Sequence, residues 1–138
     1  MRFFLGLALL GLSATQPHPV RVTVRLVGIR ADRGGVMHVA LHQAPGTGFP
    51  GPAPSANQDV PVREPEATLT FETTAGTYAI AVHHDANANG KLDANFLGIP
   101  KEGYGVSRDV RARFRAPRFT EAQVTVQRDT TLVVRLAY

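Results

Sequence analysis

Apolar and polar residues alternate along several short stretches of this chain. From Val20 to Leu26 every second residue is apolar, and Arg21, Thr23 and Arg25 fill the positions between them. This period of two is typical of a strand with one buried face. Five further runs share it: 34–42, 67–72, 77–84, 122–126 and 131–138. No long stretch shows the 3.6-residue period of a helix, so the sequence predicts an all-β chain.

The predicted strands are short, and clusters of Gly, Pro, Asn and Asp separate them. Six or seven such strands favour an antiparallel β-sandwich of about seven strands. The 138 residues suffice for one domain with a packed core and are too few for two ordinary domains. We expect the runs 20–26 and 34–42 to form a hairpin around the turn at Asp32 to Gly35.

Two connections are too long to be simple turns. Residues 44–66 contain six prolines, so over much of this stretch we expect an exposed, mobile loop without strand or helix. Residues 85–118 contain most of the chemistry that the sequence offers. Long connections in compact domains are commonly functional or disordered.

The first 14 residues have the pattern of a secretory signal peptide. Arg2 precedes an apolar run from Phe3 to Leu12, and the small residue Ala14 follows. The run falls short of the roughly 20 apolar residues of a spanning helix, so we do not expect an integral membrane protein. The sequence predicts a cleaved signal peptide at 1–14, a single domain at 15–138 and a periplasmic or secreted protein. Because the chain has no Cys, disulfides cannot stabilise that domain, and its stability must come from a packed core.

The stretch 83–95, HHDANANGKLDAN, places oxygen-bearing side chains at regular intervals around an Asn-Gly pair. Counted from Asp85, the spacing matches the first nine residues of an EF-hand calcium loop, with Gly90 at the sharp turn. The ligands predicted on this basis are Asp85, Asn87, Asn89, Lys91 through its carbonyl, Asp93 and, more distantly, Glu102.

The complete EF-hand is rejected, because Phe96 stands where the bidentate Glu belongs and no helices are predicted on either side. A weak Ca²⁺ site in a β context remains. The alternative is a purely polar turn in which Asn and Asp side chains bond to their own backbone.

Neither zinc binding nor nucleophilic catalysis is favoured. His38 and His42 would lie about 13 Å apart along a strand, and His83 and His84 would point to opposite faces. We expect His84 to be a hydrogen-bonded residue that orients the Asp85 loop. Ser107 lacks the flanking glycines of a nucleophile elbow. The sequence therefore predicts a protein that is not an enzyme.

The basic residues gather in one segment. Between Lys101 and Arg118 there are six cationic residues and two acidic ones. If residues 110–116 are extended, Arg111, Arg113 and Arg115 share a face at intervals of about 6.5–7 Å, which suits repeated anionic groups. An anionic envelope polymer is then the expected partner, and a merely solvated cationic face is the alternative. The export signal argues against nucleic acid.

Two stretches, AVHHDANANGKLDANFLGIPKEGYGVS and FRAPRFTEAQVTV, together with the terminal TLVVRLAY, resemble the bacterial exported family known as domain of unknown function 2141. The resemblance covers most of the chain after residue 14. It implies a compact β-sandwich, prealbumin/transthyretin-like or immunoglobulin-like in style, that is exported. It implies no known reaction.

Two functional classes follow from these observations. The first is an exported, non-enzymatic module whose Asp85 to Glu102 loop is ordered by Ca²⁺ and displays His84, Tyr104 and the arginines to an anionic envelope polymer or another exported protein. The alternative is an enzyme or carrier that acts on an anionic small molecule or glycan and uses the same loop as the floor of its pocket.

Overall fold

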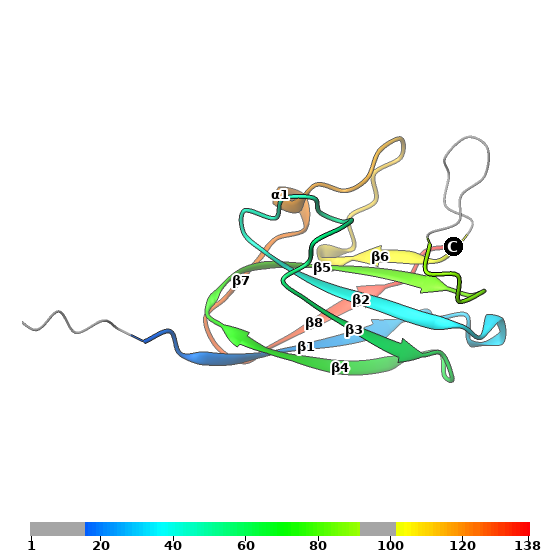
Figure 1. The fold of residues 1–138 in the computed structure, drawn as a ribbon, viewed down its shortest axis with the longest axis horizontal. Helices are drawn as coiled ribbons and strands as arrows, with labels where there is room; N and C mark the ends of the chain where they lie inside the picture. The colour runs from blue at the N-terminus through cyan, green and yellow to red at the C-terminus, as the bar shows by residue number, and fades with distance from the viewer. Residues whose placement is uncertain (1–15, 92–101) are drawn as a thin grey trace, which may run out of the picture.

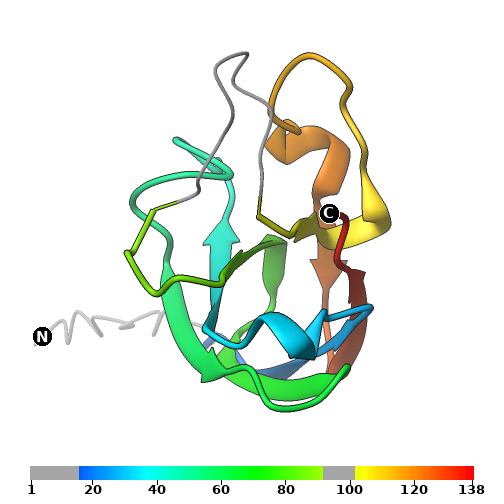
Figure 2. The ribbon, with the colours of Figure 1, turned by 90° about the vertical axis from the view of Figure 1, so that its right-hand side faces the viewer.

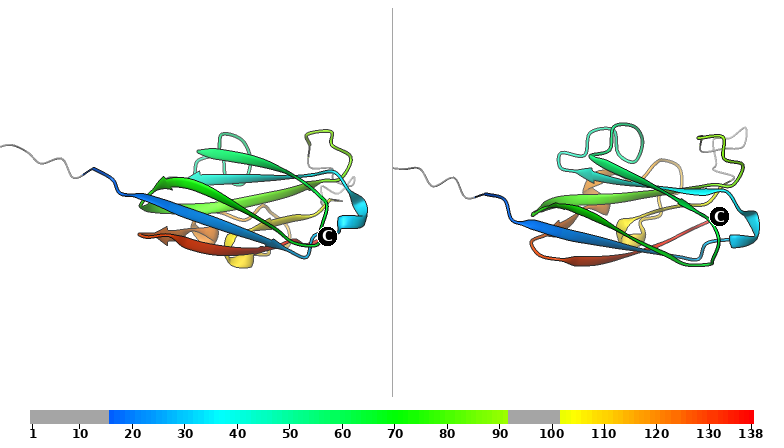
Figure 3. Two further views of the ribbon diagram at one scale, coloured as in Figure 1. Left: turned by 90° about the horizontal axis from the view of Figure 1, so that it is seen from below. Right: turned by 60° about the horizontal axis from the view of Figure 1, so that its bottom comes forward.

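The computed structural model describes residues 16–91 and 102–138, which form two β-sheets packed face to face (Figures 1 and 3). Eight strands lie within these residues. Their bounds are β1 Pro19–Val27, β2 Val36–Gln43, β3 Ala56–Pro61, β4 Ala67–Thr74, β5 Gly76–Asp85, β6 Tyr104–Val106, β7 Val124–Val126 and β8 Thr130–Arg135. One short α-helix, α1 (Phe119–Ala122), and two single turns of 3-10 helix, Ala31–Arg33 and Ser107–Asp109, complete the fold. The predicted β-sandwich is confirmed.

The smaller sheet has the order β4-β1-β8. Strand β1 pairs antiparallel with β4 and parallel with β8, so the sandwich is not purely antiparallel. The larger sheet has the order β3-β2-β5-β6, and β7 pairs with the beginning of β5. Strand β5 is therefore the centre of the larger sheet.

The main core lies between the two sheets, where the period-two pattern places the apolar side chains. Strand β1 contributes Val20, Val22, Val24 and Leu26, all buried. Facing side chains come from β2, β4, β5 and β8: Met37, Val39, Leu41, Leu69, Phe71, Tyr78, Ile80, Val82 and Val134. Removing this much apolar surface from water contributes most of the free energy that favours the folded state.

A second, smaller cluster lies on the outer face of the larger sheet. Phe119 of α1 packs there on small residues of β5, and Phe49 from the connection after β2 joins it. The Phe49 and Phe119 rings meet edge to face, with centroids 5.9 Å apart. The connections 44–55 and 110–118 both rise from this side of the sandwich (Figures 1 and 2). The larger sheet thus has an outer face that is partly covered.

Two predictions about connectivity are wrong. The runs 20–26 and 34–42 do not form a hairpin, because β1 and β2 lie in different sheets. The stretch 44–66 is not a continuous loop, because β3 forms within it and pairs antiparallel with β2. The prolines flank or end this edge strand, where a missing N–H is tolerated.

Candidate functional site

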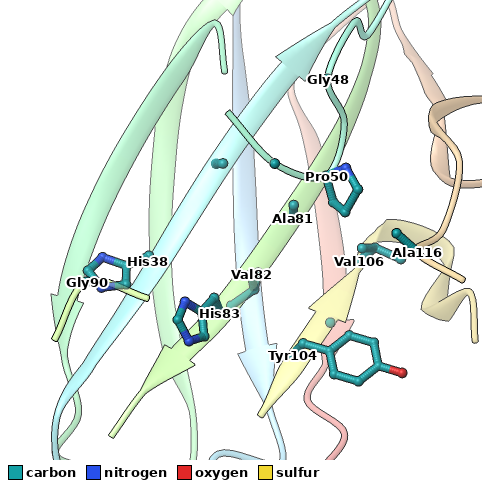
Figure 4. A pocket seen from close by; sticks show the side chains of 13 residues that line it. His38, Gly48, Pro50, Ala81, Val82, His83, Gly90, Tyr104, Val106 and Ala116 are labelled. Atoms are coloured by element: carbon teal, nitrogen blue, oxygen red, sulfur yellow. The ribbon is translucent and has the colours of Figure 1, made fainter. Parts of the chain in front are cut away.

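A groove of about 680 Å³ crosses the outer face of the larger sheet (Figure 4). Small residues make its floor, notably Ala40 of β2, Ala81 of β5 and Gly105 of β6. Pro50 and Ala116, from the two connections that rise from this face, line it as well. A volume of this size is typical of small-molecule sites, which hold about 300–1,000 Å³.

Strand register explains why one end of the groove is polar and the rest is apolar. Asp59, His38, His83 and Tyr104 occupy matching positions on β3, β2, β5 and β6. The next outward row pairs Ala40 with Ala81 and Ala81 with Val106. Figure 4 shows His38, His83 and Tyr104 projecting from three neighbouring strands. One row thus supplies polar groups, and the adjacent row supplies the apolar floor.

His38 lies between two carboxylates. Its Nδ1 lies 2.7 Å from Asp59 Oδ1, and its Nε2 lies 3.1 Å from Asp85 Oδ2. Partial burial lowers the pKa of His38, but the hydrogen bonds to Asp59 and Asp85 outweigh it and raise the pKa above 6.5. A carboxylate only accepts, so the imidazolium, with an N–H on each nitrogen, satisfies both contacts.

The second imidazole, His83, is also held by a carboxylate. Its Nε2 lies 2.9 Å from Glu102 Oε2. Glu102 is buried, and its other oxygen accepts the backbone N–H of Ala86 at 3.1 Å. The His38 and His83 rings have centroids 5.7 Å apart. Two imidazoles and three carboxylates therefore gather at one end of the groove.

The loop after β5 folds around the Asp85 side chain. Asp85 Oδ1 accepts the N–H of Asn89 at 3.1 Å, and Oδ2 accepts the N–H of Gly90 at 2.7 Å. Burial raises the pKa of Asp85, but the hydrogen bonds from His38 and these two amides outweigh it and lower the pKa below 3.8. The Asn side chains behave similarly, since Asn89 Oδ1 accepts the N–H of Lys91 at 2.9 Å. This is the geometry of a polar turn.

The residues predicted as calcium ligands are only partly brought together. Asp93 lies outside the described residues. Glu102 pairs with His83, whereas Asp85 pairs with His38. Among the residues that the structure describes, no three His, Asp or Glu side chains form a group able to hold a metal ion. Because Asp85 already accepts two amides and an imidazole, the described donors fit calcium as a weak site at most.

The other histidines lie apart from the groove. His84 is fully buried, with Nδ1 2.6 Å from the Tyr138 hydroxyl and Nε2 2.7 Å from the Gly34 carbonyl. It is hydrogen-bonded and points away from His83, as predicted, but its partners are Tyr138 and Gly34 and not the Asp85 loop. Because it is fully buried, it is not displayed to a partner. His42 is also buried, against Phe49, and burial lowers its pKa.

The predicted row of arginines is not formed. Residues 110–118 form no strand, and residues 113–115 make a bend. Arg111 donates to the Arg135 carbonyl at 2.7 Å and lies over the Tyr104 ring, whereas Arg115 pairs with Glu121 at 2.6 Å. Arg113 is exposed. Different partners therefore hold Arg111 and Arg115, and Arg111 is the predicted binding arginine whose contact with Tyr104 the structure shows.

Sequence reasoning missed the pairing of His38 with His83 and the groove beside it. Spacing along a strand keeps these side chains apart, whereas their contact arises across neighbouring strands. An outward His at the same register on two adjacent strands was the available signal, but the order of the strands was needed to use it.

The structure is thus a small all-β domain, a β-sandwich with a groove on one outer face and an acidic, imidazole-containing end to that groove. The chain belongs to the family described as uncharacterized protein conserved in bacteria (DUF2141), whose model matches residues 24–133. Comparison with curated proteins and with solved structures gave no match. Within the described residues, no helix has the length and apolar character needed to cross a membrane.

Proposed function

We propose that this chain is a non-enzymatic binding protein that holds a small, largely apolar molecule in the groove. The observation that supports it is the groove itself, where the small outward side chains of Ala40 and Ala81 leave room above the sheet. Burying the apolar surface of a ligand there supplies affinity, and the polar end fixes its orientation.

The charge of the polar end indicates which ligands fit. Asp59, Asp85 and Glu102 surround two imidazoles, so the group is net negative even when both imidazoles are protonated. A ligand with a carboxylate or phosphate at this end would be repelled. We infer a ligand that is neutral or cationic there, which argues against the anionic small molecule of the alternative interpretation.

The engagement of the Ser107 hydroxyl supports the proposal of binding without catalysis. Ser107 is buried, its Oγ accepts the N–H of Ile80 at 3.0 Å and donates to the Ala122 carbonyl at 2.6 Å. This hydroxyl serves the packing of α1 against β5 and is not directed toward a ligand as a nucleophile.

Binding of the neutral apolar fluorophore N-phenyl-1-naphthylamine tests the groove. We expect the wild type to enhance its fluorescence saturably. Ala40→Leu should weaken binding by roughly tenfold or more, because the added side chain occupies ligand volume on the floor. Thr68→Leu, on the exposed outer face of β4, is the matched control and should bind like the wild type. Equal affinity in all three proteins would refute the proposal.

We further propose that the protein is exported and that its partner is anionic material of the cell envelope or another exported protein. The support for export is the signal pattern at residues 1–14, which lie outside the described residues. Intact-mass analysis of periplasmic or secreted material should give a chain that starts near Thr15. Full-length protein confined to the cytosol would contradict export.

A further inference from the structure

A connection on the same side of the sandwich as the groove presents an exposed aromatic ring among arginines. We define the arginine loop as residues 108–118, which contain five arginines and Asp109. Within it Phe114 is 98% exposed. Isolated exposed apolar residues are common, but an aromatic ring left almost wholly in water between two arginines, Arg113 and Arg115, gains nothing from the fold. The exposure of the Phe114 ring must therefore be explained by what surrounds the protein and not by its fold.

Contacts at the base of the arginine loop hold its tip outward. Arg111 bonds to the Arg135 carbonyl, and Asp109 Oδ1 accepts the N–H of Arg135 at 3.0 Å, so the first half is tied to β8. Arg115 is tied to Glu121 beside α1. Arg113 has neither an ion pair nor a hydrogen bond from its side chain to any described residue. Phe114 and Arg113 are thus presented together at the tip.

We propose that the arginine loop docks on an anionic lipid surface. Phe114 enters the interfacial layer, where an aromatic ring leaves water, and Arg113 beside it pairs with lipid phosphates, for which the guanidinium geometry is suited. Attraction between basic residues and an anionic leaflet adds to this binding. A soluble anionic polymer would use the charges and leave the ring exposed, so the ring favours lipid.

Docking in this way has a consequence for the groove. Ala116 belongs to the arginine loop and lines the groove, so the loop is also one of its walls. A surface that binds the tip therefore lies close to the groove. Docking of the arginine loop does not require a ligand in the groove, and vesicle binding is measured separately from fluorophore binding.

Sedimentation with lipid vesicles tests the docking, using phosphatidylcholine vesicles with and without phosphatidylglycerol. We expect the protein to bind only the anionic vesicles. Phe114→Ser should weaken this binding severalfold, whereas Val133→Ser, an apolar residue on β8 that is 45% exposed, should not. Arg113→Glu should weaken it by roughly tenfold or more, since each basic residue near the membrane contributes about 1 kcal/mol. Arg63→Glu, in the exposed turn between β3 and β4, is the charge-matched control.

Binding to dextran sulfate separates lipid from anionic polymer. We expect Phe114→Ser to bind this polymer like the wild type and Arg113→Glu to bind it less. If Phe114→Ser binds vesicles as well as the wild type does, the ring takes no part and the lipid proposal fails in favour of an anionic polymer. If Arg63→Glu lowers vesicle binding as much as Arg113→Glu does, attraction is set by net charge alone and the proposal also fails.

Discussion

Single residues in the turn between β1 and β2 set the position of the polar end of the groove. Gly34 and Gly35 both have positive φ, +61° and +80°. A Cβ on Gly35 would overlap the Asp85 carbonyl oxygen, whereas a Cβ on Gly34 would meet nothing within 4 Å. Gly35 therefore allows the turn to approach the end of β5 directly, and no other residue type allows that contact.

Replacing these glycines should separate backbone strain from close packing. Gly34→Ala should cost about 1–3 kcal/mol of unfolding free energy through its backbone conformation alone. Gly35→Ala should cost distinctly more, because the end of β5 must also move. Urea unfolding of both variants measures the difference. Equal losses of unfolding free energy in the two variants would show that the close approach of Gly35 to Asp85 does not affect stability.

The protonation of His38 should make stability depend on pH in a defined direction. Its pKa is raised above 6.5, so its stabilising contribution is complete below that value and is lost as pH rises through the raised pKa. The pKa of Asp85 is lowered below 3.8, so its contribution is present above that value and is lost as pH falls through the lowered pKa. Both contributions are present between those two values.

His38→Gln should therefore lose more stability relative to the wild type at about pH 5.5 than at about pH 8.5. The effect should be modest, because Asp59 is largely exposed and solvent screens this half of the interaction. Unfolding free energies of both proteins at the two pH values give the measurement. A larger loss at the higher pH would contradict the assigned ion pair.

At the scale of elements, the sequence predicts where the strands lie better than it predicts which strands pair with each other. Alternation locates β1, β2, β4, β5, β7 and β8, because each has one face in the core. It misses β3, which lies among prolines at a sheet edge, and the three-residue strand β6. Period two assigns a residue to a face but does not say which strand lies beside it. The groove depends on that second fact, so it could not be predicted.

For the loop after β5, the chemistry of the side chains limits what the sequence can predict. Spacing places Asp85 at the first position of a calcium loop, and in the structure the loop folds around this side chain. The same Asp and Asn oxygens suit both Ca²⁺ and backbone amides. We expect Ca²⁺ to bind with a dissociation constant no tighter than about 10⁻⁴–10⁻³ M, as in weak extracellular sites. Amide shifts of Asn87, Asn89 and Gly90 during titration with Ca²⁺, with Mg²⁺ as the control ion, provide the test. Identical responses to both ions would leave only the polar turn.

At the scale of the whole molecule, Tyr138 connects the two sheets. It follows β8 of the smaller sheet, and its hydroxyl contacts buried His84 on β5 of the larger one at 2.6 Å. The same hydroxyl accepts the N–H of Arg30, between β1 and β2, at 3.0 Å. Since the Gly34 carbonyl can only accept, His84 Nε2 carries a proton, and Nδ1 is left to pair with Tyr138.

Tyr138→Phe should therefore destabilise the sandwich by about 1–3 kcal/mol, because a buried ring nitrogen loses its partner while the aromatic packing is kept. Tyr104→Phe is the matched control: the Tyr104 hydroxyl makes no hydrogen bond to any described residue, so its removal should change stability by less than about 0.5 kcal/mol. Thermal and urea unfolding of the two variants measure the contrast. If Tyr138→Phe is as stable as Tyr104→Phe, water replaces the hydroxyl and the link between the sheets rests on packing alone.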